Sequence, residues 1–192
     1  MKRMRSSAMV SKTFLRRQIA SGHLHCEGEQ WSLELEDEDI PEPMEPEAAL
    51  WPEVVDDFGA VAVLDKRAGL TTMRGRSGGP STVDAARLLL SKQRGREVRV
   101  YPVHRLDRET SGLLVVALDL TAARRLSEAL ATHQVRKTYW ALVQGSPPEQ
   151  DTIDAPVGNA GKPGKMRVFG RSPRAATTEF RVIERFRTAS LL

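Results

Sequence analysis

The stretch VHRLDRETSGLLVVA, residues 103–117, decides how the rest of the chain is interpreted. It places the carboxylate of Asp107 between the cations of Arg105 and Arg108, and an apolar run over residues 113–118 follows a short polar turn. This pattern predicts a polar loop that leads directly into a buried strand. Loops that a rigid scaffold holds in place are common positions for reactive side chains.

Length and composition limit the class of protein. With 192 residues, the chain has room for one medium domain and a small appendage. Its longest strictly apolar run, residues 113–118, is far shorter than the roughly 20 residues of a membrane-spanning helix. Cys26 is the single cysteine, which excludes an internal disulfide and fits a reducing compartment. We therefore expect a cytoplasmic protein that does not contact a membrane.

Charge is distributed very unevenly along the chain. The net charge is +6 over residues 1–22, −13 over residues 23–57 and +11 over residues 58–192. A body with a charge of +11 is typical of a surface that binds a polyanion such as a nucleic acid. A plain solvated basic face is the alternative, and charge alone does not decide between them.

The charge pattern divides the chain into three parts. Residues 1–35 are a basic segment, with a helix expected over 11–21 and a short strand around Trp31 and Leu33, although a mitochondrial transit peptide is an alternative. Residues 36–57 are rich in Glu, Asp and Pro and predict an extended linker, which could instead fold back onto the basic body. Residues 58–192 form the main domain.

The main domain shows mixed helix and strand patterns. Strands are expected over 59–66, 113–118, 139–143 and 177–186, and a mobile loop over 156–174. One helix is expected over 81–92, with a capping-box-like start, and another begins after Asp119 or Thr121. The prediction is an α+β fold with a mixed, largely antiparallel sheet and flanking helices.

The residues around Asp107 resemble the signature of the RluA-type pseudouridine synthases. The resemblance implies an isomerase that converts specific uridines in structured RNA (rRNA or tRNA) to pseudouridine. It also implies that Asp107 is the essential catalytic residue and that no cofactor takes part. In that family the aspartate either attacks the pyrimidine ring or acts at the anomeric sugar carbon, and both routes remain open here. The alternative is a purely structural role, in which Asp107 is only an ion-pair partner of Arg105 or Arg108.

The resemblance also implies roles for further residues. Arg105 would enter the position of the flipped base, although a phosphate contact is an alternative. VRKTYWALVQG, residues 135–145, resembles the strand that carries an active-site tyrosine, so Tyr139 would stack on the uracil and Lys137 would face phosphate or brace the site. We also expect Arg108 to bind substrate. Residues 11–35 weakly resemble an RNA-binding module whose phosphate contacts would be Arg16 and Arg17.

The resemblance covers residues 58–192 and only the front part of the family domain. DKRAGL, residues 65–70, resembles another family patch but carries Arg67 where proline is usual. The family continues with an arginine segment that pairs with the catalytic aspartate, whereas this chain stops at Leu192. We therefore expect a C-terminally incomplete domain, and an RNA-binding but catalytically inactive relative is the alternative.

Other chemistries have little support in the sequence. His23, His25 and Cys26 lack the second ligand cluster of a metal site, so no metal is expected. Motifs for nucleotide binding or serine hydrolysis are missing, so no nucleotide cofactor is expected. His104 is interpreted as a packed histidine at a strand end rather than a general base. We expect the protein to be a monomer with structured RNA as its partner.

Overall fold

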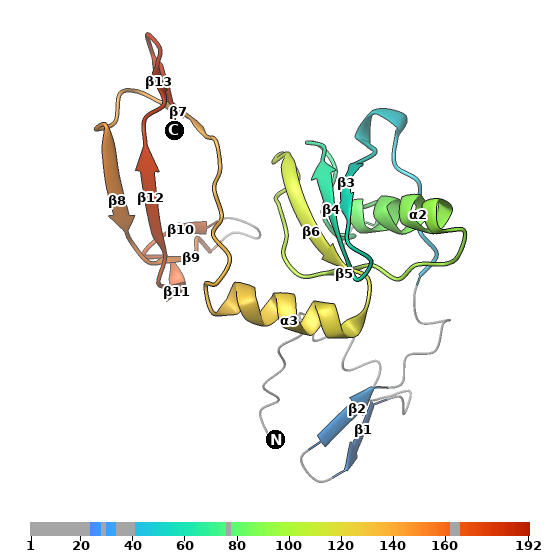
Figure 1. The fold of residues 1–192 in the computed structure, drawn as a ribbon. Helices are drawn as coiled ribbons and strands as arrows, with labels where there is room; N and C mark the ends of the chain where they lie inside the picture. The colour runs from blue at the N-terminus through green and yellow to red at the C-terminus, as the bar shows by residue number, and fades with distance from the viewer. Residues whose placement is uncertain (1–23, 28–29, 34–40, 76–77, 162–165) are drawn as a thin grey trace. The chain divides into compact units, whose positions relative to one another are not determined.

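The computed structural model describes residues 24–27, 30–33, 41–75, 78–161 and 166–192. The chain divides into two compact units, of which the first ends at Val135 and the second begins at Arg136 (Figure 1). All strand pairs in the described part of the chain are antiparallel. Two α-helices accompany them in these residues, so the α+β prediction is confirmed.

A four-stranded antiparallel sheet forms the centre of the first unit. Its strand order is β3-β4-β6-β5, with bounds Glu53–Asp57, Val61–Lys66, Gly112–Ala117 and Tyr101–Pro102. The apolar run after the Asp107 loop thus forms the interior strand β6, as predicted. Side chains alternate along β4, so that Ala62, Leu64 and Lys66 are buried while their neighbours are half-buried.

Helix α2, Thr82–Arg94, covers one face of this sheet. Its residues Ala86 and Leu90 pack in one cluster with Leu64, Leu114 and other core residues of β4 and β6. The helix begins with the expected capping box, in which the Ser81 side chain accepts from the backbone N–H of Asp84 and the Asp84 carboxylate accepts from that of Ser81.

Helix α3, Leu120–Ala131, follows β6 after two residues, Leu118 and Asp119. The Asp119 carboxylate accepts from the N–H of Ala122 at 2.7 Å, so Asp119 rather than Thr121 caps the helix. Ala123, Leu126 and Leu130 pack against a small second cluster of Val103, Ala117 and Ala122. These three residues therefore form the inward face of the helix, which packs beside the end of β6 at Ala117.

The structure corrects part of the expected linker. Glu53–Asp57, at the end of the predicted linker over residues 36–57, form strand β3 and pair with β4. A short 3-10 helix, Ala48–Leu50, precedes them. Val54 packs against the main core, and this burial outweighs the repulsion among the acidic residues of the strand.

Short strands make up the second unit. They pair as β8 with β12, as β13-β14-β7 and as β10-β9-β11. Their bounds are Leu142–Gln144 (β7), Gln150–Asp154 (β8), Val157–Asn159 (β9), Met166–Val168 (β10), Arg171–Arg174 (β11), Thr177–Arg181 (β12), Glu184–Arg185 (β13) and Ala189–Leu191 (β14).

Two expectations for the second unit are corrected. The predicted loop over 156–174 contains β9, β10 and β11, because its glycines allow the strands to pack backbone against backbone. The predicted strand over 177–186 is two strands, since β12 pairs with β8 and β13 pairs with β14.

The N-terminal region is described only in part. Leu24–Glu27 and Gln30–Leu33 form an antiparallel pair, β1 and β2, which agrees with the strand expected around Trp31 and Leu33. The helix expected over 11–21, with Arg16 and Arg17, lies outside the described residues. Within the described ranges, no helix has the length and apolar character needed to cross a membrane.

A charged contact ties the end of α2 to the β3–β4 turn and gives a pH-dependent prediction. The Arg94 guanidinium and the backbone N–H of Gly59 both donate to Asp57, which lowers the pKa of its carboxyl. Because the folded state holds this carboxyl more strongly ionised than the unfolded chain does, the contact stabilises the fold above the ordinary aspartate pKa. The contribution is lost as the pH falls through the lowered pKa.

We expect Arg94→Met to lower the free energy of unfolding by about 1 kcal/mol at neutral pH. The difference from wild type should shrink in acid, which urea unfolding at a series of pH values would measure. The exposed residue Arg96 offers a control, Arg96→Met, with no such pH dependence. A difference that is the same at neutral and acidic pH would contradict this assignment.

Candidate active site

Asp107 lies on the loop between β5 and β6, and its side chain is 85% exposed. Its carboxylate has one ion pair among the described residues, in which Arg105 Nη2 lies 3.6 Å from Asp107 Oδ1. The Arg105 side chain is itself 65% exposed. The carboxylate therefore points into solvent beside one loosely held cation and is accessible to a large substrate.

The residues before and after Asp107 are fixed, in contrast to its side chain. On one side, Leu106 is buried, and its backbone both donates to Thr72 Oγ1 at 3.1 Å and accepts from the same hydroxyl at 2.7 Å. His104 Nε2 accepts from the backbone N–H of Val115 at 2.9 Å, which supports its interpretation as a histidine packed at a strand end. The loop is thus tied to the 71–72 segment and to β6.

Lys66 fixes the other side of the loop. This lysine is fully buried at the end of β4, and its ammonium donates to the backbone carbonyls of Arg67, Arg108 and Thr110 at 2.9, 3.1 and 2.7 Å. These three bonds use all three donors of the ammonium group. One buried cation therefore joins the end of β4 to the residues that follow Asp107.

Burial lowers the pKa of Lys66, because the low-dielectric interior disfavours its charged form. The carboxylates of Glu109 and Asp107 act in the opposite direction and favour the ammonium. The cation beneath the loop and the carboxylates above it therefore stabilise one another across the turn, in addition to the three hydrogen bonds.

The turn after β4 braces the loop as well. Gly69 donates its backbone N–H to the carbonyl of Arg108 at 2.8 Å, and Arg108 Nε donates to the carbonyl of Gly69 at 2.8 Å. Gly69 has a φ of +94°, a backbone conformation that residues with a side chain rarely adopt, so this position favours glycine. Arg108 thus contributes to the shape of the loop, while its role in substrate binding remains a prediction.

The hydroxyl of Thr72 gives a direct test of how firmly the loop is held. We expect Thr72→Val to lower the free energy of unfolding by about 1–3 kcal/mol, because the buried N–H and C=O of Leu106 both lose their partner. Urea unfolding would measure this loss. The exposed hydroxyl of Thr132, which bonds within α3, provides a control, Thr132→Val, with a change of about 0.5 kcal/mol or less. Equal effects of the two substitutions would contradict a special role for Thr72.

Tyr139 and Lys137 belong to the second unit, and both are exposed. The predicted strand over 139–143 is shorter than expected, since β7 begins at Leu142. Next to the pairing of β7 with β14, the backbones of Ala141 and Leu192 exchange two hydrogen bonds. Tyr139 and Asp107 belong to different units, and a site that they share remains a prediction.

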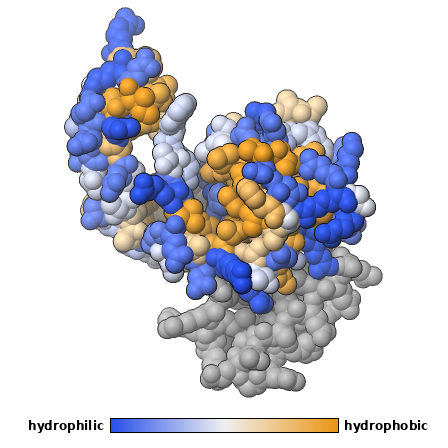
Figure 2. Space-filling model, in the orientation of Figure 1, coloured by the Kyte–Doolittle hydropathy of each residue, from blue (hydrophilic) through white to orange (hydrophobic). Residues whose placement is uncertain are grey.

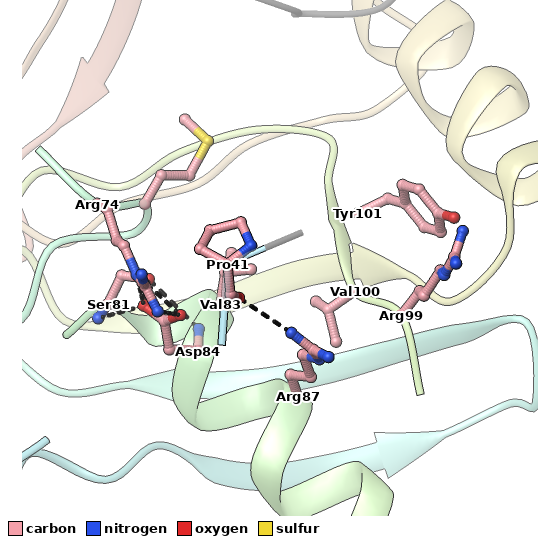
Figure 3. A pocket seen from close by; sticks show the side chains of 10 residues that line it. Pro41, Arg74, Ser81, Val83, Asp84, Arg87, Arg99, Val100 and Tyr101 are labelled. Atoms are coloured by element: carbon pink, nitrogen blue, oxygen red, sulfur yellow. Dashed lines mark hydrogen bonds and ion pairs between the residues drawn. The ribbon is translucent and has the colours of Figure 1, made fainter. Parts of the chain in front are cut away.

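A separate pocket of about 340 Å³ lies at the start of α2 and does not include the Asp107 loop among its lining residues (Figure 3). Its polar wall is satisfied internally, because Arg74 binds Asp84 through Nε and Nη2 and Ser81 donates to the same carboxylate. The bond to Asp84 also raises the pKa of Arg74. These groups serve the fold of the helix start, and we assign them no role in chemistry.

Sequence reasoning missed the role of Lys66, which was expected only to be the last residue of the strand over 59–66. A usable signal was present, because Lys66 follows Ala62 and Leu64 at the spacing of one strand face. A lysine at a core position of a strand has to find partners for its ammonium group. The carbonyls of the Asp107 loop are those partners.

Comparisons with known proteins show to which family the sequence is similar. The sequence model of the RNA pseudouridylate synthase family matches residues 60–192. An uncharacterised RNA pseudouridine synthase of Chloroflexus aurantiacus is 44% identical over 98 residues, which cover 51% of this chain and 31% of that protein. The ribosomal large subunit pseudouridine synthase D of Pseudomonas aeruginosa is 34% identical over 160 residues, which cover 83% of this chain and 49% of that protein.

The fold is also found in a solved structure, human RNA pseudouridylate synthase domain containing 4. The two structures agree with a TM-score of 0.60 at 26% identity, over 72% of this chain and 56% of the human chain. This chain spans less than half the length of the two curated relatives. The family model nevertheless matches most of its residues, and the chain therefore belongs to the RNA pseudouridylate synthase family.

Proposed function

We propose that this protein is an RNA pseudouridine synthase that isomerises uridine in structured RNA, either ribosomal RNA or tRNA. The observation that carries the proposal is the presentation of Asp107. Its side chain is 85% exposed, although the backbone on both sides is held by hydrogen bonds to the buried residues Thr72 and Lys66. A nucleophile has to be accessible and held in position, and an exposed carboxylate on a fixed backbone meets both requirements.

The reaction needs only groups that the chain itself can provide. Uridine and pseudouridine have the same atoms and oxidation state, so no redox cofactor is needed. The Asp107 carboxylate attacks either the pyrimidine ring or the anomeric carbon, and the C–N glycosidic bond breaks. The base turns, a C–C bond forms to the sugar, the ring carbon loses its proton and the freed ring nitrogen gains one. Asp107 then leaves unchanged.

Arg105 is proposed to assist the removal of the target base from the RNA stack. Extracting a base costs a few kcal/mol, and a planar cation that occupies the vacated position recovers part of this energy. Arg105 suits this role because its side chain is 65% exposed and its contact with Asp107 is a long 3.6 Å. Its guanidinium can exchange that contact for a base without breaking a buried bond.

The remaining contacts are proposed from the family resemblance. Tyr139 is 56% exposed, and its ring is available to stack on the extracted uracil. Lys137 and Arg108 would hold nearby phosphates or the base. Arg16 and Arg17 would add contacts at the N-terminal end, and the charge of +11 over residues 58–192 favours RNA as the partner of the whole body. A ribosomal substrate accords with the name of the Pseudomonas aeruginosa relative.

A second candidate function is RNA binding without catalysis. In this alternative, Asp107 serves only as the ion-pair partner of Arg105. In this case the chain would bind RNA with the salt dependence of any phosphate-contacting protein but form no product.

Incubation with unmodified transcripts of large-subunit ribosomal RNA and of tRNA distinguishes the two candidates. After digestion to nucleosides, chromatography and mass spectrometry would detect pseudouridine. We expect pseudouridine at one or a few positions of one transcript. Transcripts that are bound but contain no pseudouridine would contradict the proposed activity and support the second candidate.

A further inference from the structure

Residues 166–174, which we call the β9 crossover, have an unusual path. β10 and β11 pair with opposite edges of β9 and both run antiparallel to it, so Phe169 and Gly170 carry the chain across this strand. The crossing is tight: a Cβ atom added to Gly158 would lie 2.7 Å from the backbone of Gly170 and Arg171. Only glycine at positions 158 and 170 permits this approach.

Phe169 is held at the crossing in a conformation that is rare for a bulky residue. Its φ is 54°, and its backbone N–H donates to the carbonyl of Pro156 at 2.8 Å. Nevertheless the side chain is 72% exposed, so it contributes little to a core that would offset the strain. Strained backbone that is not explained by packing is concentrated at functional sites.

The surroundings of Phe169 are strongly basic. Residues 166–174 contain three arginines, Arg167, Arg171 and Arg174, and no acidic residue. All three are exposed, and none of them forms an ion pair within the described part of the second unit. An exposed aromatic ring among arginines that are available to bind phosphate is the combination that single-stranded nucleic acid requires, since bases stack on the ring while cations follow the backbone.

We propose that the β9 crossover is an RNA contact in which an unpaired base stacks on Phe169 and flanking phosphates bind its three arginines. This inference rests on the proposed function, because it assumes that RNA is the partner. It adds a subsite for an unpaired nucleotide that is formed by the second unit alone. The contact would favour RNA with an unpaired loop over a continuous duplex.

The test compares the affinity of the full chain for two labelled RNA probes, a hairpin with a uridine-containing loop and a fully paired duplex, by fluorescence anisotropy. Phe169→Leu removes the aromatic face and keeps an apolar side chain. We expect it to weaken hairpin binding about tenfold and to leave duplex binding unchanged. Phe169→Trp keeps an aromatic face and should bind the hairpin with wild-type affinity. Arg171→Gln should weaken RNA binding and reduce its salt dependence by about one phosphate.

Phe58→Leu is the matched control, because Phe58 is also an exposed phenylalanine, at 66%, but lies in the first unit. It should leave both affinities unchanged. Should Phe169→Leu lower the urea midpoint, Phe169→Asn replaces it, since asparagine tolerates the left-handed backbone. Wild-type affinity of Phe169→Leu or Phe169→Asn for the hairpin, or an equal loss for hairpin and duplex, would overturn the inference and leave the proposed function standing. If the wild-type chain binds neither probe, the proposed function itself fails.

Discussion

Asp107→Asn is expected to lower the rate of pseudouridine formation by at least about 1000-fold, without weakening RNA binding. Asparagine has nearly the same shape but lacks the negative charge and the nucleophilic oxygen, and removing a nucleophile has effects of this size or larger. Because the Asp107 side chain is 85% exposed, the free energy of unfolding should change by about 0.5 kcal/mol or less. Nucleoside analysis, anisotropy with the labelled hairpin and urea unfolding would measure the three quantities.

Glu109→Gln is the control for this substitution. Glu109 lies on the same loop, and its side chain is 80% exposed beside Arg108. Its replacement also removes one negative charge, so it reproduces the electrostatic change without removing the proposed nucleophile. We expect it to keep the rate within about threefold of wild type. An Asp107→Asn protein as active as Glu109→Gln would show that Asp107 is only an ion-pair partner.

Lys66→Met is expected to have the second-largest effect, on both stability and rate. Methionine fills a similar volume and avoids the burial of a charge, but it removes the ammonium donor from the carbonyls of Arg67, Arg108 and Thr110. Of these three, the Arg108 carbonyl keeps the backbone N–H of Gly69 as a donor. We expect the free energy of unfolding to fall by about 2–4 kcal/mol. The rate should fall about 100-fold, because a small displacement of a catalytic group is enough for such a loss.

The rate effect has to be separated from unfolding. We would therefore measure single-turnover rates at a temperature where urea curves show the variant to be fully folded. Lys92→Met is the control, because Lys92 is an exposed lysine near the end of α2. It should change neither quantity appreciably. If a folded Lys66→Met protein reacts at the wild-type rate, Lys66 stabilises the domain but does not position Asp107.

The sequence predicted the first unit well because its signals are local. The length and continuity of the apolar run indicate that β6 is an interior strand, and short-range capping by Ser81 and Asp119 fixes the starts of α2 and α3. The prediction that Asp107 is exposed on a loop follows from the same pattern. No long-range information was needed for any of these elements.

Contacts between distant segments could not be predicted in the same way. The ammonium of Lys66 donates to carbonyls 42 and 44 residues away along the chain, and sequence periodicity does not predict which carbonyls these are. Composition also led to a wrong secondary-structure prediction in two segments of the chain. The acidic residues of β3 hid a strand that is held by Val54, and the glycines around Phe169 indicated a loop where they permit a close crossing of strands.

The most direct test of the account is single-turnover tritium release from uridine labelled at the ring carbon that becomes attached to the sugar. Wild type, Asp107→Asn and Lys66→Met would be compared at saturating protein, so that differences in RNA affinity do not matter. The account predicts rapid release by wild type, release slowed about 100-fold by Lys66→Met and no detectable release by Asp107→Asn. Release by Asp107→Asn at the wild-type rate would contradict the central claim that this carboxylate performs the reaction.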